Sequence, residues 1–146
     1  MTTASQGAAT RPALSAGYRV LVVEDAPDLR ELLRLTFEGE GYEVLTAGDG
    51  LTGVETALRE LPDAIVMDMS LPGLDGYNAA RLLRREPALA GVPLIACTAY
   101  NRWEWRGKAI AAGFDAFMTK PLDLSRLTAT LAALLARHTN RLTSSA

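Results

Sequence analysis

The fold of this chain is decided by the stretch RVLVVEDAPDLRELLRLTFEGEG, residues 19–41. It opens with a β-rich apolar run of strand length that ends in acids. Pro27 then suits the first turn of a helix. Apolar side chains follow at helical spacing, at Leu29, Leu32, Leu33 and Phe37. Gly39 and Gly41 stop the pattern, so the stretch predicts one strand followed by one amphipathic helix.

The same alternation of a short apolar run and an amphipathic stretch repeats along the rest of the chain. Further strands are predicted at residues 42–47, 64–67, 92–97 and 116–118. Further helices are predicted at about 51–60, 77–85 and 103–111, with a closing helix marked by the leucines of 124–135. Five strand–helix pairs in strict order indicate an α/β fold, a five-stranded parallel sheet with helices on both faces.

Composition is ordinary for one globular domain, because 49% of the 146 residues are hydrophobic and 22% are charged. A net charge of −2 gives no reason to expect direct nucleic-acid binding. The single cysteine, Cys97, excludes a disulfide within the chain and favours a reducing compartment. No segment suits a signal peptide or a membrane span, so we expect a cytoplasmic protein without membrane contact.

Functional side chains follow four of the predicted strands, at the point where each strand ends. Glu24 and Asp25 follow the first strand, Asp68 the third, Thr98 the fourth and Lys120 the fifth. In a parallel sheet, ligands bind beyond the carboxyl ends of the strands. Three carboxylates close together need either a cation or a shift in protonation. Oxygen-only ligands favour a hard cation such as Mg²⁺. The pattern indicates a site for phosphoryl chemistry, in which a carboxylate can become an acyl phosphate.

Each of these residues has a plainer interpretation when it is taken alone. Acids after a strand are usually helix caps or solvated turns, and a lysine before a proline is usually a surface turn. Lys120 has some added weight, because it is one of only two lysines among 15 basic residues. The stronger argument is the combination, since all the groups fall at the positions that the sheet rule marks.

Four segments carry a resemblance to the receiver domains of two-component response regulators, of the stand-alone type. They read VLVVEDAPDLRELL (20–33), AIVMDMSLPGLDGYNAARLLR (64–84), PLIACTAY (93–100) and AAGFDAFMTKPLD (111–123). The resemblance covers roughly residues 18–137, with flexible tails expected at 1–17 and 138–146. It implies a flavodoxin-like, doubly wound sheet with strand order 2-1-3-4-5.

The resemblance also implies a role for each acid. Asp68 is then the phosphoacceptor, and Glu24 and Asp25 hold Mg²⁺ together with Asp68 and the backbone carbonyl of Ser70. Mn²⁺ is an alternative ion. The acidic pair is Glu-Asp rather than the commoner Asp-Asp, which still supplies two hard ligands.

The remaining implied roles concern the switch. Thr98 is the hydroxyl that closes on the phosphoryl group, and Lys120 is its ion-pair partner. Phe117 falls at the aromatic position that turns inward as Thr98 moves. The peptide bond before Pro121 is cis in the family, and an X-Pro bond permits this.

Three local features concern phosphoryl lifetime and partner binding. Ser70 and Tyr100 occupy the positions, two after the acceptor and two after the threonine, that the resemblance implies govern water access to the phosphoryl group. We expect bulky Tyr100 to shield it. Trp103 and Trp105, flanked by arginines, open the helix at 103–111. They suit either core packing or a partner surface, since exposed Trp and Arg are typical of binding hot spots.

In function, the resemblance implies a signalling switch that catalyses only its own phosphorylation and autodephosphorylation. A sensor histidine kinase or a histidine phosphotransfer protein would supply the phosphoryl group. The face formed by the helix at 103–111, the fifth strand and the closing helix would then control partner binding, with a homodimer through this face as a further option. His138, the only histidine, is expected to be a solvated side chain at a frayed end rather than a phosphoryl relay.

Other functions remain to be weighed against this one. A phosphatase of the haloacid dehalogenase type needs a second acid two residues after its nucleophile, where this chain has Ser70. Flavin binding needs a phosphate loop after the first strand, where Glu24 and Asp25 would repel phosphate. A phosphorylation-independent scaffold or a phosphate sink is the main alternative, although such scaffolds typically lack one of the groups that this chain retains.

Overall fold

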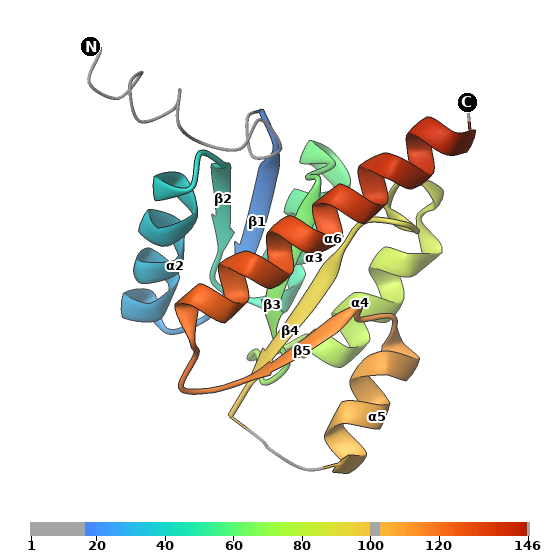
Figure 1. The fold of residues 1–146 in the computed structure, drawn as a ribbon. Helices are drawn as coiled ribbons and strands as arrows, with labels where there is room; N and C mark the ends of the chain where they lie inside the picture. The colour runs from blue at the N-terminus through green and yellow to red at the C-terminus, as the bar shows by residue number, and fades with distance from the viewer. Residues whose placement is uncertain (1–16, 100–102, 146) are drawn as a thin grey trace.

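The computed structural model describes residues 17–99 and 103–145, apart from the side chains of residues 103–105 and 140–145. Its centre is a five-stranded sheet in the order β2-β1-β3-β4-β5, and each neighbouring pair of strands is parallel (Figure 1). The strands are β1 (Arg19–Val23), β2 (Glu43–Ala47), β3 (Ala64–Asp68), β4 (Leu94–Thr98) and β5 (Ala116–Thr119). The predicted fold class and strand order are confirmed.

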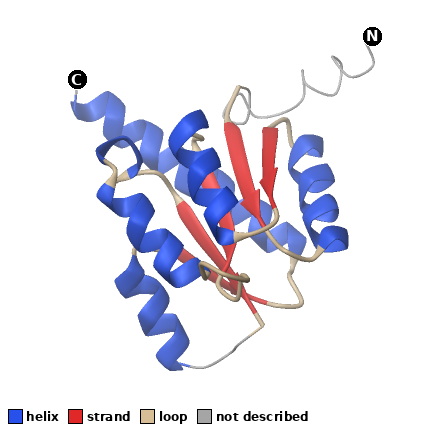
Figure 2. Cartoon of the chain, turned by 180° about the vertical axis from the view of Figure 1, so that it is seen from behind, coloured by secondary structure: helices blue, strands red, loops and turns tan. Residues whose placement is uncertain are grey.

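A helix follows each strand. The helices are α2 (Pro27–Gly39), α3 (Gly50–Glu60), α4 (Gly76–Arg85), α5 (Trp103–Ala112) and α6 (Leu124–Ser145), and a short 3₁₀ turn, η2 (Pro87–Leu89), separates α4 from β4. The sequence pattern gives no signal for η2, which was not predicted. Figure 1 looks onto the face of the sheet that α6 crosses, and Figure 2 shows the opposite face, covered by α3, α4 and α5.

Alternate residues of β1 show how the sheet separates two cores. Leu21 and Val23 belong to a core shared with α3, α4 and α5. Val20 and Val22 belong to a second core, shared with α2 and α6. All four side chains are at most 1% exposed, and full burial of such a side chain contributes about 1.5–3 kcal/mol. Because successive strand side chains point to opposite faces, a continuous apolar run stabilises both layers.

Helix starts beside the carboxyl edge of the sheet are fixed by capping. The side chain of Asp49 accepts a hydrogen bond from Thr52 N at the start of α3, and Asp75 does the same for Asn78 N at the start of α4, both at 2.8 Å. A cap of this kind stabilises a helix by about 1 kcal/mol. A separate hydrogen bond, from Gly76 N to the carbonyl oxygen of Met69 at 3.1 Å, joins the start of α4 to the residue that follows β3.

The closing helix is longer than its leucine pattern predicted, because α6 runs through His138 to Ser145. The flexibility expected of the tail at 138–146 stays a prediction. No glycine or proline interrupts the segment, and Tyr18 Oη lies 2.6 Å from Thr139 Oγ1. His138 is half-buried and faces Gly91 rather than lying at a frayed end. Within the described residues, none of the helices is both long and apolar enough to cross a membrane.

Candidate functional site

The pairing register brings the chemically active residues to one edge of the sheet. Val23, the last residue of β1, pairs with Met67, so Glu24 and Asp68 follow as neighbours. On the other side of β3, Asp68 pairs with Cys97, and Thr98 pairs with Thr119 one step further along. The strand ends that sequence analysis marked therefore form one continuous edge.

Three carboxylates gather at this edge. One carboxylate oxygen from each of Glu24, Asp25 and Asp68 lies within 4.8 Å of the other two. Glu24 is 2% exposed and Asp68 is 5% exposed, whereas Asp25 lies at the surface. Two buried acids and one solvent-facing acid form an oxygen-only donor set that fits a hard divalent cation retaining some of its water.

Lys120 supplies an ammonium to the same edge. Its Nζ lies 3.0 Å from Glu24 Oε1 and 3.0 Å from Asp68 Oδ2. One ammonium cannot neutralise three carboxylates, so the site keeps a negative charge that favours a further cation. The pairing of Lys120 with Glu24 was missed by sequence reasoning, because nothing in the spacing of residues 24 and 120 indicates a contact between them.

Backbone groups fix the two buried acids. Ser70 N donates to Asp68 Oδ1 at 2.9 Å, and Ala26 N donates to Glu24 Oε2 at 3.1 Å. The guanidinium of Arg30 donates to the carbonyl oxygen of Glu24 at 2.8 Å. Lys120 Nζ is the donor to the second carboxylate oxygen of each acid. Both carboxylates are therefore held in defined orientations.

The pKa values of the paired groups move in the directions that burial and charge require. Burial raises the pKa of Glu24, and the nearby Asp68 charge adds to this, although the N–H of Ala26 and the ammonium of Lys120 act against it. Burial lowers the pKa of Lys120, but its hydrogen bonds to Glu24 and Asp68 outweigh this and the net pKa is raised. Lys120 therefore remains an ammonium at neutral pH.

Thr98 and Phe117 lie on the side of the site toward β5. Thr98 is the last residue of β4 and is 1% exposed. Its carbonyl oxygen accepts a hydrogen bond from Lys120 N at 2.7 Å. Phe117, in β5, is partly buried against the core shared with α3, α4 and α5. The peptide bond between Lys120 and Pro121 is cis.

Some candidate residues are not placed. Tyr100 lies outside the described residues, and the side chains of Trp103 and Trp105 are likewise not described. Expectations about phosphoryl shielding and about a tryptophan surface therefore stay predictions.

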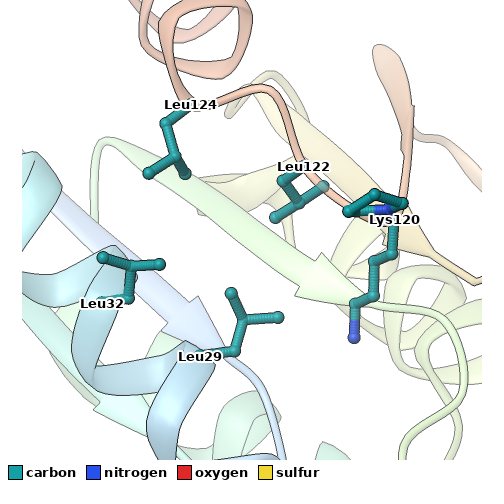
Figure 3. Close-up of a pocket in the computed structure, with 6 residues that line it drawn as sticks. Leu29, Leu32, Lys120, Leu122 and Leu124 are labelled. Atoms are coloured by element: carbon teal, nitrogen blue, oxygen red, sulfur yellow. The ribbon is translucent and has the colours of Figure 1, made fainter.

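An apolar pocket borders the site. It has a volume of about 350 Å³ and is lined by Leu29, Leu32, Lys120, Pro121, Leu122 and Leu124. Figure 3 shows the two α2 leucines facing the two leucines that follow β5, with the Lys120 side chain at one side of the pocket. The methylene groups of Lys120 thus line the pocket, while its ammonium contacts the carboxylates of Glu24 and Asp68.

Comparison with known proteins supports a single family. The family model described as the response regulator receiver domain matches residues 20–132. The DNA-binding dual master transcriptional regulator RpaA of Synechocystis is 34% identical over 85% of this chain and 51% of its own length. The chain thus spans about half the length of that relative.

Two further likenesses cover most of the matched protein. An uncharacterized 14.6 kDa protein of Leptolyngbya boryana is 40% identical over 71% of this chain and 79% of that protein. The crystal structure of the receiver domain of sensor histidine kinase PA1611 from Pseudomonas aeruginosa has a TM-score of 0.77 and 35% identity, covering 83% of this chain and 99% of that one. That structure has a magnesium ion coordinated in its active site cleft.

Proposed function

The chain belongs to the response regulator receiver domain family, and from this premise we propose that Asp68 accepts a phosphoryl group in a magnesium-dependent reaction. The observation that carries the proposal is the cluster at the carboxyl edge of the sheet. Three carboxylates have oxygens within 4.8 Å of one another, and Lys120 lies 3.0 Å from two of them. The chain acts as a signalling switch rather than an enzyme that turns over a substrate.

The transfer step needs only a nucleophile, charge stabilisation and a histidine donor. A carboxylate oxygen of Asp68 forms a bond to phosphorus as the P–N bond to the donor imidazole breaks, and the electron pair of that bond stays on nitrogen. Lys120 stabilises the oxygens of the phosphoryl group as a compact positive charge. Ser70 N, already a donor to Asp68, holds the acceptor carboxylate in place.

Glu24, Asp25 and Asp68 would hold the metal ion, with the carbonyl oxygen of Ser70 as a further ligand. Mg²⁺ would supply positive charge for the phosphoryl oxygens when bound, and Mn²⁺ would serve as an alternative. The exposure of Asp25 supports this assignment, because a surface carboxylate gives the ion a route from solvent.

Phosphorylation would shift the chain between two states. The new charge attracts the hydroxyl of Thr98, and Phe117 moves into the space that Thr98 leaves. The coupled face is formed by α5, β5 and α6, and it would control partner binding or homodimer formation. A phosphoryl group shifts the equilibrium only by as much as it interacts better with one state than with the other.

The phosphodonor would be a sensor histidine kinase or a histidine phosphotransfer protein, and a cytoplasmic location is part of this proposal. The main alternative is a phosphorylation-independent scaffold or a phosphate sink. Retention of Lys120, Thr98 and all three acids favours the switch. A phosphate sink would be phosphorylated without any change in the α5–β5–α6 face. A switch would change that face on phosphorylation, and this change can be measured.

Phosphotransfer from a histidine phosphotransfer protein, followed by intact-mass spectrometry, tests the proposal. Wild type should gain the mass of one phosphoryl group when Mg²⁺ is present and not when EDTA is added. Asp68→Asn should gain none, while Asp28→Asn, a matched change at an exposed position of α2, should behave as wild type. Equal labelling of wild type and Asp68→Asn would overturn the assignment.

A further inference from the structure

Arg30, in α2, holds the loop that carries two of the acids of the site. One nitrogen of its guanidinium, Nη1, donates to the carbonyl oxygen of Glu24 at 2.8 Å and to that of Asp25 at 3.5 Å, the second a weak bond. The backbone N–H of Arg30 donates to the carbonyl oxygen of Ala26 at 2.9 Å. One residue therefore contacts three successive carbonyl groups of the loop between β1 and α2.

The residue at the N-cap of α2 gives this loop no side-chain support. It is Ala26, which has no side-chain oxygen to accept from the first N–H groups of the helix, whereas an aspartate does this for α3 and for α4. The carboxylates of Glu24 and Asp25 also lie close to that of Asp68, and like charges repel. Acids under this repulsion stay together only if the backbone that carries them is fixed.

Gly48, which follows β2, lies against the guanidinium from the other side. A β-carbon at position 48 would sit 3.2 Å from Nη1 of Arg30 and 3.8 Å from its Cζ. The Arg30 side chain is partly buried there, between the loop after β1 and the loop after β2. A planar guanidinium in such a position is better ordered than a flexible ammonium would be.

We propose that Arg30 is a positioning residue for the metal-binding acids. It fixes the backbone of Glu24 and Asp25, so that their carboxylates stay within reach of one ion although they repel each other. It acts through these two acids and does not itself bind the ion, because a guanidinium is a cation without a lone pair to offer. The proposal rests on the proposed function, because it assigns both acids to the metal site.

Equilibrium Mg²⁺ titration of the full chain separates positioning from a simple effect of charge. Arg30→Met should bind Mg²⁺ about tenfold more weakly than wild type, as is typical when a group that orients metal ligands is lost. If Arg30 acted only through its positive charge, its removal would tighten binding to the acids. Tighter or unchanged binding in Arg30→Met overturns the proposal.

Arg34→Met is the matched control for this titration. It removes the same charge one turn further along α2, where Arg34 pairs with Glu31 and Glu38 rather than with the loop. Exposed ion pairs of this kind contribute little, so Mg²⁺ affinity should stay within about twofold of wild type. A loss as large as that of Arg30→Met would overturn the proposal, because it would come from charge or from α2 as a whole.

Two milder substitutions test the geometry. Arg30→Lys keeps the charge but not the planar fork, so it should recover only part of the lost affinity, and full recovery would overturn the proposal. Gly48→Ala crowds the guanidinium without touching the acids and should weaken Mg²⁺ binding. In the Arg30→Met background the same change should cost nothing further, because the group that it displaces is gone. Equal losses in both backgrounds would overturn the proposal.

Amide hydrogen exchange in EDTA gives a readout that needs no metal. The N–H of Ala26 donates to Oε2 of Glu24 at 3.1 Å, so its exchange reports on the order of the loop. Arg30→Met should speed this exchange several-fold. The N–H of Asn78, bonded to Asp75 at the start of α4, should exchange as in wild type. A general loss of stability would speed both amides alike, and that result would overturn the proposal.

The two proposals for the site fail in different ways. If Arg30→Met does not fold, Arg30→Lys and Gly48→Ala decide the question. Wild type that binds Mg²⁺ and is phosphorylated, with unchanged Mg²⁺ affinity in these variants, overturns the positioning role alone. Wild type that binds no Mg²⁺ overturns the proposed function as well.

Discussion

Gly76, the first residue of α4, lies against the backbone of Asp68. A β-carbon at position 76 would sit 2.2 Å from the carbonyl oxygen of Asp68 and 2.7 Å from Cα of Met69. The backbone N–H of Gly76 also donates to the carbonyl oxygen of Met69 at 3.1 Å. The start of α4 is therefore a support for the residue that we propose as phosphoacceptor.

Gly76→Ala should destabilise the protein and slow phosphorylation, because the close approach is to backbone, which cannot rotate away. We expect a loss of about 1–3 kcal/mol in the free energy of unfolding, measured by urea denaturation. Gly107→Ala, in α5 where a β-carbon would meet nothing within 4 Å, is the control and should stabilise by up to ~1 kcal/mol. Equal effects of the two changes would contradict the support role.

Arg84→Met should be one of the most destabilising changes on the surface. The guanidinium donates to the carbonyl oxygens of Leu89, Val92 and Gly113, at 3.0, 2.7 and 2.6 Å. It thereby ties the loop before β4 to the turn before β5. Losing these bonds should cost about 2–4 kcal/mol of unfolding free energy.

The neighbouring Arg85 gives the control for that change. Arg85→Met removes the same charge from an exposed position of α4 and should alter stability by less than about 0.5 kcal/mol. Urea denaturation curves of both variants measure the two losses in the free energy of unfolding. A loss for Arg84→Met no larger than that for Arg85→Met would contradict the role of Arg84 in joining the two loops.

Cys97 should react slowly with alkylating reagents in the native protein. Burial, with the charges of Asp68 and Glu24, raises the pKa of this thiol to about 12. At pH 8 its thiolate fraction is therefore about a thousandfold below that of a thiol with an ordinary pKa near 9. Because deprotonation stays incomplete, the rate should climb about tenfold per pH unit between pH 8 and 10 without a plateau.

Iodoacetamide labelling followed by mass spectrometry measures this rate. The same thiol should react rapidly in denaturant, which controls for reagent quality. A native rate that levels off near pH 9 would mean that the thiol is neither buried nor shifted.

Thr98→Val should separate phosphorylation from switching. Thr98 is 1% exposed, so a valine of similar shape fits. We expect Asp68 still to be phosphorylated, because the hydroxyl takes no part in bond formation. Loss of a hydrogen bond to a charged group costs about 1.5–3 kcal/mol, so the population of the switched state should fall tenfold or more. NMR shifts of Phe117 and Met118 on adding beryllofluoride and Mg²⁺ measure that population, and wild-type shifts in the variant would contradict the role of Thr98.

The sequence predicted the strands of the sheet and the meeting of the acids at the site, but not every contact that the structure shows. The apolar runs of the strands and the leucine spacing of the helices predicted five parallel strands, because periodicity is a local property. The acids at positions 24, 25 and 68 were predicted to meet, because parallel strands share a carboxyl edge.

Features that depend on three-dimensional reach were not predicted. The pairing of Glu24 with Lys120 joins residues 96 positions apart, and side-chain length rather than sequence pattern decides it. The helical course of 138–145 was missed because polar residues there resemble a frayed end, although Thr139 is held by Tyr18. The sequence indicates the contact of Gly76 with Asp68 only by a glycine that follows Asp75.

The central claim is that the phosphoryl group is carried by Asp68, and trapping of the acyl phosphate tests it most directly. The phosphorylated chain is reduced with borohydride, which converts an aspartyl phosphate to homoserine, and peptides are sequenced by mass spectrometry. We expect homoserine at position 68 in protein incubated with the phosphodonor and Mg²⁺, and none in protein incubated with the phosphodonor and EDTA. Homoserine at another position, or a phosphoryl group found on His138, would contradict it.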